Sequence, residues 1–399
     1  MNEQQPIFTP EQFRAQAVEL SQAVAELQRR DSRTIDPYDP FENETEFHAY
    51  QNDYAEIVPQ IRIPGCRIPL RANAREKSKI RRFYNIVGVF LLMHLVFSNL
   101  LAIGIEELIL LLMRITDGMA VAELPDNYIS LATDRINNSS SLIAVNLLVF
   151  GIMNVLTVFL GCRATKVKLP NLFRTKQFSA FTAFSYITII VFIQSAMGYA
   201  AMGLTDLFSG VGIVLYEPDL GSETDLKTAV LSAIYSIIVA PITEELLMRG
   251  FVLKNLSRVS QRFGIVMSAF LFGIWHENVA QFLLAFTGGL FFGYITVKHD
   301  SLVPSIICHM AVNSFAEFGS IFEDNGWETA YMLLNTVYFL LVLAGIVLLI
   351  RLLIVERFPR TTPHQAERGL RQAFASPLLM IVVFCHIALS VAMIAIESR

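Results

Sequence analysis

The amino-acid sequence predicts an all-α fold, a polytopic transmembrane helical bundle with about eight or nine spanning helices. Of 399 residues, 54% are hydrophobic and only 17% are charged, and the mean hydropathy is +0.49. Soluble domains carry about 25% charged residues. Apolar stretches also recur along the chain, and roughly 20 apolar residues are enough to cross a hydrocarbon core. The lipid bilayer is therefore the expected partner, and we expect no nucleic-acid partner.

The chain divides by composition into a polar tail, residues 1–80, and a transmembrane domain, residues 81–399. Within the tail we expect one amphipathic helix, because Thr9 is suited to cap a helix that starts at Pro10. A basic cluster, Arg71 to Arg82, ends the tail directly before the first apolar stretch. Such a cluster suits anionic lipid, but its simpler interpretation is a signal that holds the tail in the cytoplasm.

Nine apolar stretches are candidates for the spanning helices. The two that meet near Phe282 have no obvious turn between them, so one of the pair is expected to be short or re-entrant. The stretches cover residues 83–113, 141–162, 178–204, 226–248, 264–283, 283–298, 302–322, 331–355 and 375–397.

Connections rich in Lys and Arg alternate along the chain with connections rich in Asp and Glu. Because Lys and Arg accumulate in cytoplasmic loops, we expect the N-terminus in the cytoplasm and the C-terminus outside. The expected location is the plasma membrane, as a multi-pass integral protein.

Two adjacent carboxylates, Glu244 and Glu245, end a long apolar run and are followed by Arg249. Carboxylates at membrane depth are costly unless compensated, so they indicate a functional site. Glu245 and Arg249 are spaced to meet on one helix face, which predicts a structural ion pair. Glu244 points about 100° away around the helix and is left as a base or a ligand.

Two later apolar stretches contain further polar residues: His276 in FLFGIWHENVAQF, and His309 with Asn313 in SIICHMAVNSF. His309 and Asn313 are one helical turn apart, so two donors can face one developing oxyanion. Taken alone, an intramembrane His or Asn is more often a helix-to-helix hydrogen-bonding residue. The combination with the two carboxylates favours hydrolytic chemistry. His94 has no such accompanying signal and is expected to serve in packing.

The three clusters share an order and a spacing: Glu244-Glu245-x-x-x-Arg249, Phe272-x-x-x-His276 and His309-x-x-x-Asn313. This pattern resembles the CPBP family of intramembrane proteases, also called CAAX-processing or Abi proteins. The resemblance covers about residues 225–320, which would be the catalytic core. It implies a membrane-embedded endopeptidase. Eukaryotic members of the family remove the last three residues from prenylated CAAX proteins, and bacterial members are more varied.

The resemblance also implies roles for the residues of the pattern. Glu244 would activate water with help from His276, while His309 and Asn313 would polarise the scissile carbonyl and stabilise the oxyanion. The implied structural supports of the site are Glu245, Arg249 and Phe272.

A divalent metal such as zinc is left open by the sequence. Glu244, His276 and His309 could furnish three ligands around an open position, and the same groups also suffice for a metal-free glutamate mechanism. A conventional zinc protease helix is unsupported, because the fifth position of a HExxH pattern starting at His276 is Ala280.

The expected substrate is a peptide or protein, with its lipidation left open. Two other functions fit part of the pattern. Intramembrane carboxylates and histidines also occur in proton- or ion-coupled transporters. The second alternative is a non-catalytic membrane scaffold or bacteriocin-immunity protein.

Overall fold

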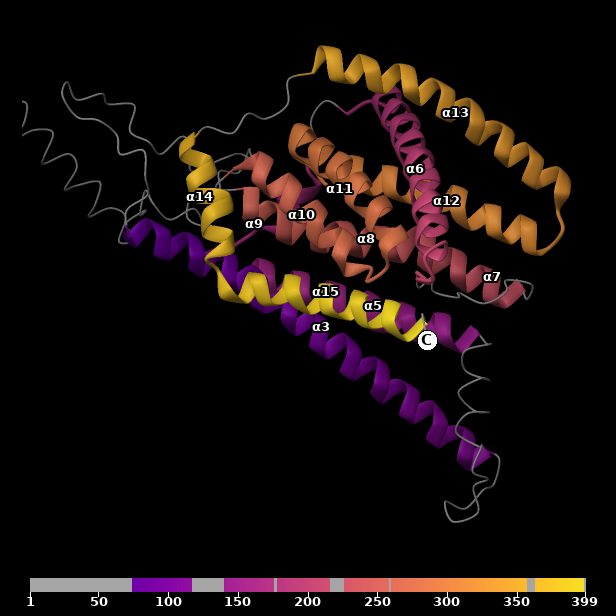
Figure 1. Ribbon diagram of the computed structural model, residues 1–399, viewed down its shortest axis with the longest axis horizontal. Helices are drawn as coiled ribbons and strands as arrows, with labels where there is room; N and C mark the ends of the chain where they lie inside the picture. Colours follow the sequence, from indigo (N-terminus) through magenta and orange to yellow (C-terminus); the bar gives the residue numbers. More distant parts are fainter. Residues whose placement is uncertain are drawn as a thin grey trace, which may run out of the picture.

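The computed structural model describes residues 74–116, 140–175, 178–215, 226–257, 260–356 and 363–397. Within these ranges the chain is all-α, with no strand (Figure 1). The all-α prediction is therefore confirmed. The amphipathic helix expected after Thr9, and residues 1–73 of the tail as a whole, lie outside the described residues.

Eight of the nine apolar stretches coincide largely with helical segments, whereas the stretch 264–283 runs from α10 through a connection into α11. The stretch from residue 226 forms one rod of five consecutive segments, α7 to α9, in which η3 and η4 are π-helical. A 3-10 turn, η2, and a twelve-residue helix, α14, were not expected. The elements are α3 (Ala74–Thr116), α5 (Ser140–Ala164), η2 (Leu169–Phe173), α6 (Ala180–Ser209), α7 (Leu226–Ala233), η3 (Ile234–Val239), α8 (Ala240–Glu245), η4 (Leu246–Leu253), α9 (Lys254–Ser257), α10 (Gln261–Trp275), α11 (Val279–His299), α12 (Val303–Asp324), α13 (Glu328–Val355), α14 (Pro363–Phe374) and α15 (Pro377–Glu397).

Seven segments of the described chain are long and apolar enough to cross a membrane, by length and composition. This is fewer than the eight or nine that were predicted. Helix α10 has only 15 residues, which is short of the roughly 20 needed for a crossing. Helix α12 is not among the seven, and it carries His309, Asn313 and Glu317 along its length. The polytopic bundle is thus confirmed with a smaller number of clear spans.

The predicted junction at Phe282 is wrong by several residues. Helix α10 ends at Trp275, and α11 begins at Val279 after Asn278, whose side chain accepts the backbone N–H of Gln281 at 2.9 Å. The connection is thus only three residues long, and His276 is the C-cap of α10 rather than a mid-helix residue. An N-cap Asn with Gln three residues later is a helix-start signal, and it is present in the sequence here.

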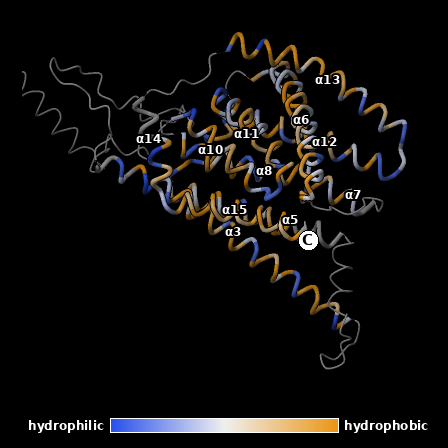
Figure 2. Tube along the Cα trace, in the orientation of Figure 1, coloured by the Kyte–Doolittle hydropathy of each residue, from blue (hydrophilic) through white to orange (hydrophobic). Residues whose placement is uncertain are grey.

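The rod α7 to α9 lies in the centre of the bundle together with α10, α11 and α12 (Figure 1). Helices α3, α5 and α15 pack along one side, and α13 packs against α6 on the other. That contact is close at Gly345, where a Cβ would collide with the carbonyl of Thr188. Only 6% of the most apolar window of α13 is buried, so this helix presents its length to lipid, whereas polar residues gather near α8 (Figure 2).

Candidate active site

The backbone that carries the two carboxylates is shaped by a proline. Pro241 lies at the start of α8, directly after the π-helical η3. In a π-helix the carbonyl of Ser236 would pair with residue 241, but proline has no N–H. In an α-helix the Ser236 carbonyl would accept from the backbone N–H of Ala240, but that N–H donates to the carbonyl of Tyr235 instead. The carbonyl of Ser236 therefore needs an external donor, and the side chain of Asn313 supplies one from α12 at 2.7 Å.

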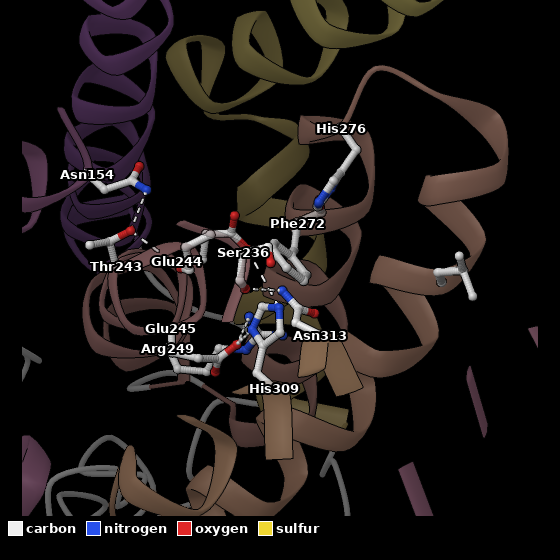
Figure 3. A network of polar contacts seen from close by, with 12 residues as sticks. Asn154, Ser236, Thr243, Glu244, Glu245, Arg249, Phe272, His276, His309 and Asn313 are labelled. Carbon is white, nitrogen blue, oxygen red and sulfur yellow. Dashed lines mark hydrogen bonds and ion pairs between the residues drawn. The ribbon is translucent and has the colours of Figure 1, made fainter. Parts of the chain in front are cut away.

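Glu245 and Arg249 form the predicted ion pair inside the bundle. The distance from Nη1 of Arg249 to Oε1 of Glu245 is 2.8 Å, and both side chains are 0% exposed. Glu245 Oε1 also accepts from Nδ1 of His309 at 3.1 Å, which ties the first cluster to the third (Figure 3). Removing one partner of such a pair leaves an uncompensated buried charge, which typically costs about 3–5 kcal/mol.

Phe272 contacts all three clusters. Its ring lies 4.6 Å from the Arg249 guanidinium carbon, a cation–π contact. The same ring meets His276 edge-on at a centroid distance of 5.0 Å and His309 at 6.0 Å. Phe292 of α11 contacts two of the same groups. Its ring is stacked on His309 with centroids 5.1 Å apart, and its centroid lies 5.4 Å from the Arg249 guanidinium carbon. Phe272 was expected as a support, whereas nothing in the sequence pattern pointed to Phe292.

Glu244 lies differently from its neighbour. Its side chain is 26% exposed, compared with 0% for Glu245, and its Oε2 is 3.8 Å from Nε2 of His309. That gap is longer than a hydrogen bond and suits a water molecule bonded to both groups. Arg249 is thus paired with Glu245, whereas the basic group that contacts Glu244 is His309, which is charged only when protonated.

His276 is held by the backbone of its own helix. Its Nδ1 is 2.8 Å from the carbonyl oxygen of Phe272, and because a carbonyl only accepts, Nδ1 carries a proton and donates. The other nitrogen, Nε2, is then the acceptor of the neutral ring. Within the described chain His276 is not bonded to Glu244, but it lies in electrostatic range of Glu244 and His309 (Figure 3).

Asn313 and His309 lie side by side on α12, as their spacing predicted (Figure 3). One turn further on is Glu317, which the sequence analysis did not single out. Its Oε2 accepts the Ser236 hydroxyl at 2.6 Å, so Ser236 is bonded to both Asn313 and Glu317. The four-residue spacing of His309, Asn313 and Glu317 was the available signal for this third polar residue.

His94 is not a simple packing residue, which corrects the expectation from the sequence. It is 1% exposed, and its Nε2 lies 2.8 Å from Oδ1 of Asn154 on α5. Asn154 in turn donates to the hydroxyl of Thr243 at 3.0 Å, one residue before Glu244. The partner that the sequence did not reveal is 60 residues away along the chain.

The proposed metal ligands do not form a metal site in this arrangement. Within the described ranges no group of three or more His, Cys, Asp or Glu side chains is placed to hold a metal ion. The Nδ1 bonds of His309 to Glu245 and of His276 to a carbonyl leave each Nε2 open, as in metal-ligating histidines. The side chains are nevertheless not placed together as the three-ligand site of a catalytic zinc in the described chain.

Comparison with known proteins identifies this part of the chain. The family model described as type II CAAX prenyl endopeptidase Rce1-like matches residues 226–315. No curated protein and no solved structure matches the chain. The matched segment runs from the start of α7 into α12 and contains all three motif clusters described above. This multi-pass membrane protein therefore carries an Rce1-like region, and its predicted likeness to the CPBP, or CAAX-processing, protease family is confirmed.

Proposed function

We propose that this protein is an intramembrane endopeptidase that hydrolyses a peptide bond near the cytoplasmic face, with Glu244 activating the attacking water. One observation carries the proposal. The three clusters of the family pattern, on α8 and η4, at the end of α10 and on α12, come together: Glu245 is bonded to His309, and the ring of Phe272 contacts both His276 and His309.

The water would lie between Glu244 and His276. Glu244 is 26% exposed, and its Oε2 is 3.8 Å from Nε2 of His309, so it is able to accept a proton from water as the oxygen attacks the scissile carbonyl carbon. A positioned general base typically contributes about 10²–10⁴ in rate. The proton then passes to the leaving nitrogen as the carbon–nitrogen bond breaks, which yields a carboxylic acid and an amine. Nε2 of His276 would serve as a second acceptor for the proton.

The oxyanion would be held by α12. An amide has two N–H bonds, and Asn313 uses one of them on the Ser236 carbonyl. That bond fixes the amide plane and leaves the second N–H for the substrate oxygen. His309 in its imidazolium form would donate from both nitrogens, one to Glu245 and one toward the oxyanion. Donors that are fixed before the reaction need no reorganisation when charge develops.

The proposed imidazolium of His309 would also balance the charges of the cluster. Arg249 is paired with Glu245, and His309 would supply a second positive charge opposite Glu244. A neutral sum is favourable because an isolated charge is costly inside a membrane protein. Glu245 and Arg249 then act as the frame that orients His309.

The proposed sidedness places the N-terminus in the cytoplasm of a plasma-membrane protein. The start of α3, with Lys77, Arg81 and Arg82 around a cavity of about 780 Å³, lies at the same end of the bundle as α9 and α14, and the C-terminus lies at the other end (Figure 1). Positive charge gathered at one end is the expected cytoplasmic signature. A substrate then arrives from the cytosol or the inner leaflet as a peptide or protein, lipidated or not.

Mass spectrometry of membrane peptides from cells that express the wild type, Glu244→Ala or Glu106→Ala tests the proposal. Glu106 is an exposed carboxylate on α3 and serves as the matched control. We expect peptides with new termini in the wild type and in Glu106→Ala that are missing in Glu244→Ala. Identical peptides in all three strains would contradict the protease assignment. A proton flux that depends on Glu244, with no peptide product, would favour a transporter instead.

A further inference from the structure

The connection that contains His276 is held in place by helices outside the matched region 226–315. Both chain neighbours of His276 have long-range partners. Glu277 is bonded to His386 of α15, with 3.0 Å between Oε1 and Nδ1. Trp275 is stacked on the same imidazole, with ring centroids 5.5 Å apart and planes at 23°. We call these two contacts of one histidine the His386 clamp.

Trp275 also contacts a second imidazole. The ring centroid of His94 on α3 lies 4.4 Å from that of Trp275, so two imidazoles contact the indole. Both histidines are buried, His94 at 1% exposure and His386 at 3%. These contacts fix the last residue of α10 from two helices that are remote in sequence.

The backbone at Glu277 needs such a restraint. Its φ is 55°, in the left-handed region that a residue with a side chain rarely adopts. A residue in this conformation persists only when its surroundings determine it, and such positions cluster at functional sites. Here the surroundings are the bond to His386 on one side and the Asn278 cap of α11 on the other.

Helix α15 is itself firmly placed. Its residues Leu379, Val382 and Val383 are buried in the same apolar core as Phe272. At the crossing with α3, a Cβ on Gly88 would lie 2.5 Å from the backbone of Leu378, so the two helices are in backbone contact. A rigid α15 is what a positioning element requires.

We propose that α15 positions His276 for catalysis through the His386 clamp, an inference that rests on the proposed function. His386 and Glu277 are positioning residues, because they hold the chain on either side of His276 and do not themselves reach the reacting atoms. A displacement of about 1 Å in a catalytic group is able to cost on the order of 10² in rate.

Two substitutions distinguish an effect of the His386 clamp on kcat from a general loss of protein stability. Glu277→Gly removes the tether but accommodates φ 55° better than glutamate does, since glycine has no Cβ. His386→Phe keeps a flat ring against Trp275 and removes only the bond to Glu277. We expect both variants to stay folded and to lose kcat by up to about 10²-fold, with KM little changed. Glu277→Gln retains the acceptor oxygen and is expected to keep most of the wild-type kcat.

His299→Phe is the matched control, because His299 is also buried and its Nε2 lies 2.9 Å from the Tyr186 hydroxyl at the other end of α11. It should lower the unfolding midpoint without lowering kcat. Wild-type kcat in both Glu277→Gly and His386→Phe would overturn the inference while leaving the proposed protease intact.

A spectroscopic readout decides the matter independently of protease activity. The chain has two tryptophans, so Trp327→Phe leaves Trp275 as the only indole. In that background we expect the fluorescence anisotropy of Trp275 to fall in His386→Ala and in Glu277→Gly. If the wild type cleaves no peptide, the proposed function fails, and this anisotropy still tests the clamp. Unchanged anisotropy in both variants would contradict it.

Discussion

The cluster inside residues 226–315 and the contacts supplied to it by α3, α5 and α15 are built in different ways. The inner cluster consists of charged groups, such as Glu245 and Arg249, that are fully buried and paired at 2.8 Å. The outer contacts consist of hydrogen bonds and ring stacking around Asn154, Trp275 and His386. The buried charged pair thus lies in the family-matched segment, whereas side chains of the other helices contact that segment through Asn154 and His386.

The largest expected effect is on the inner cluster. Arg249→Ala leaves Glu245 charged and buried, and we expect the free energy of unfolding to fall by about 3–5 kcal/mol. Denaturant unfolding in detergent measures it. Lys298→Ala is the contrast, because its pair with Glu356 is roughly one-third exposed at 30% and 32% and should contribute about 0–1 kcal/mol. Equal losses in both variants would contradict the distinction between a buried and an exposed pair.

Asn313→Ala tests the donor on α12. We expect kcat to fall by about 10²–10³-fold, the usual cost of one lost oxyanion donor. The protein should remain folded, although the carbonyl of Ser236 loses its side-chain donor and only the hydroxyl keeps its bond to Glu317. Initial rates of peptide cleavage in proteoliposomes provide the measurement. Asn99→Ala, an exposed amide on α3 that bonds only its own helix backbone, should keep the wild-type rate; a similar loss there would remove the special role of Asn313.

Asn154→Ala probes the outer contacts. It removes the bonds to both His94 and Thr243, and unmet buried polar groups cost about 1–3 kcal/mol. We expect the unfolding free energy to fall by that amount and kcat to change far less than in Asn313→Ala. Thr336→Ala, at an exposed position on α13, is the control for stability. A loss of kcat as large as that of Asn313→Ala would show that the outer contacts take part in the chemistry.

The smallest expected effect is that of metal removal. Because the described side chains offer no three-ligand site, extensive dialysis against a chelator should leave the cleavage rate unchanged. Metal analysis of the dialysed protein accompanies the assay. Loss of activity that is restored by zinc would require Glu244, His276 and His309 to rearrange into ligands.

The sequence predicted the inner cluster well because its partners are one helical turn apart. Glu245 with Arg249, and Phe272 with His276, are four residues apart and meet, although η4 is π-helical and His276 is the C-cap of α10. The end of α10 was misplaced because apolar residues resume at Val279, directly after the polar triplet His276-Glu277-Asn278, so that the predicted span ran through the triplet. The Asn278 cap was visible in the sequence.

The outer contacts had no such local signal. His94 and Asn154 are 60 residues apart, and Glu277 and His386 are 109 residues apart. Only the packing of α3, α5 and α15 brings these side chains together. The bond from Asn313 to the Ser236 carbonyl could be predicted only in part. Pro241 removes the backbone donor of that carbonyl, but this follows only once the helix is known to be π-helical there.

The central step of the proposed mechanism is the activation of water by Glu244 as a base. The rate of peptide cleavage by Glu244→Gln in proteoliposomes tests this, because glutamine has the same shape but accepts no proton from water. We predict a fall of about 10²–10⁴-fold relative to the wild type, with an unchanged unfolding midpoint. A wild-type rate in Glu244→Gln would contradict the mechanism.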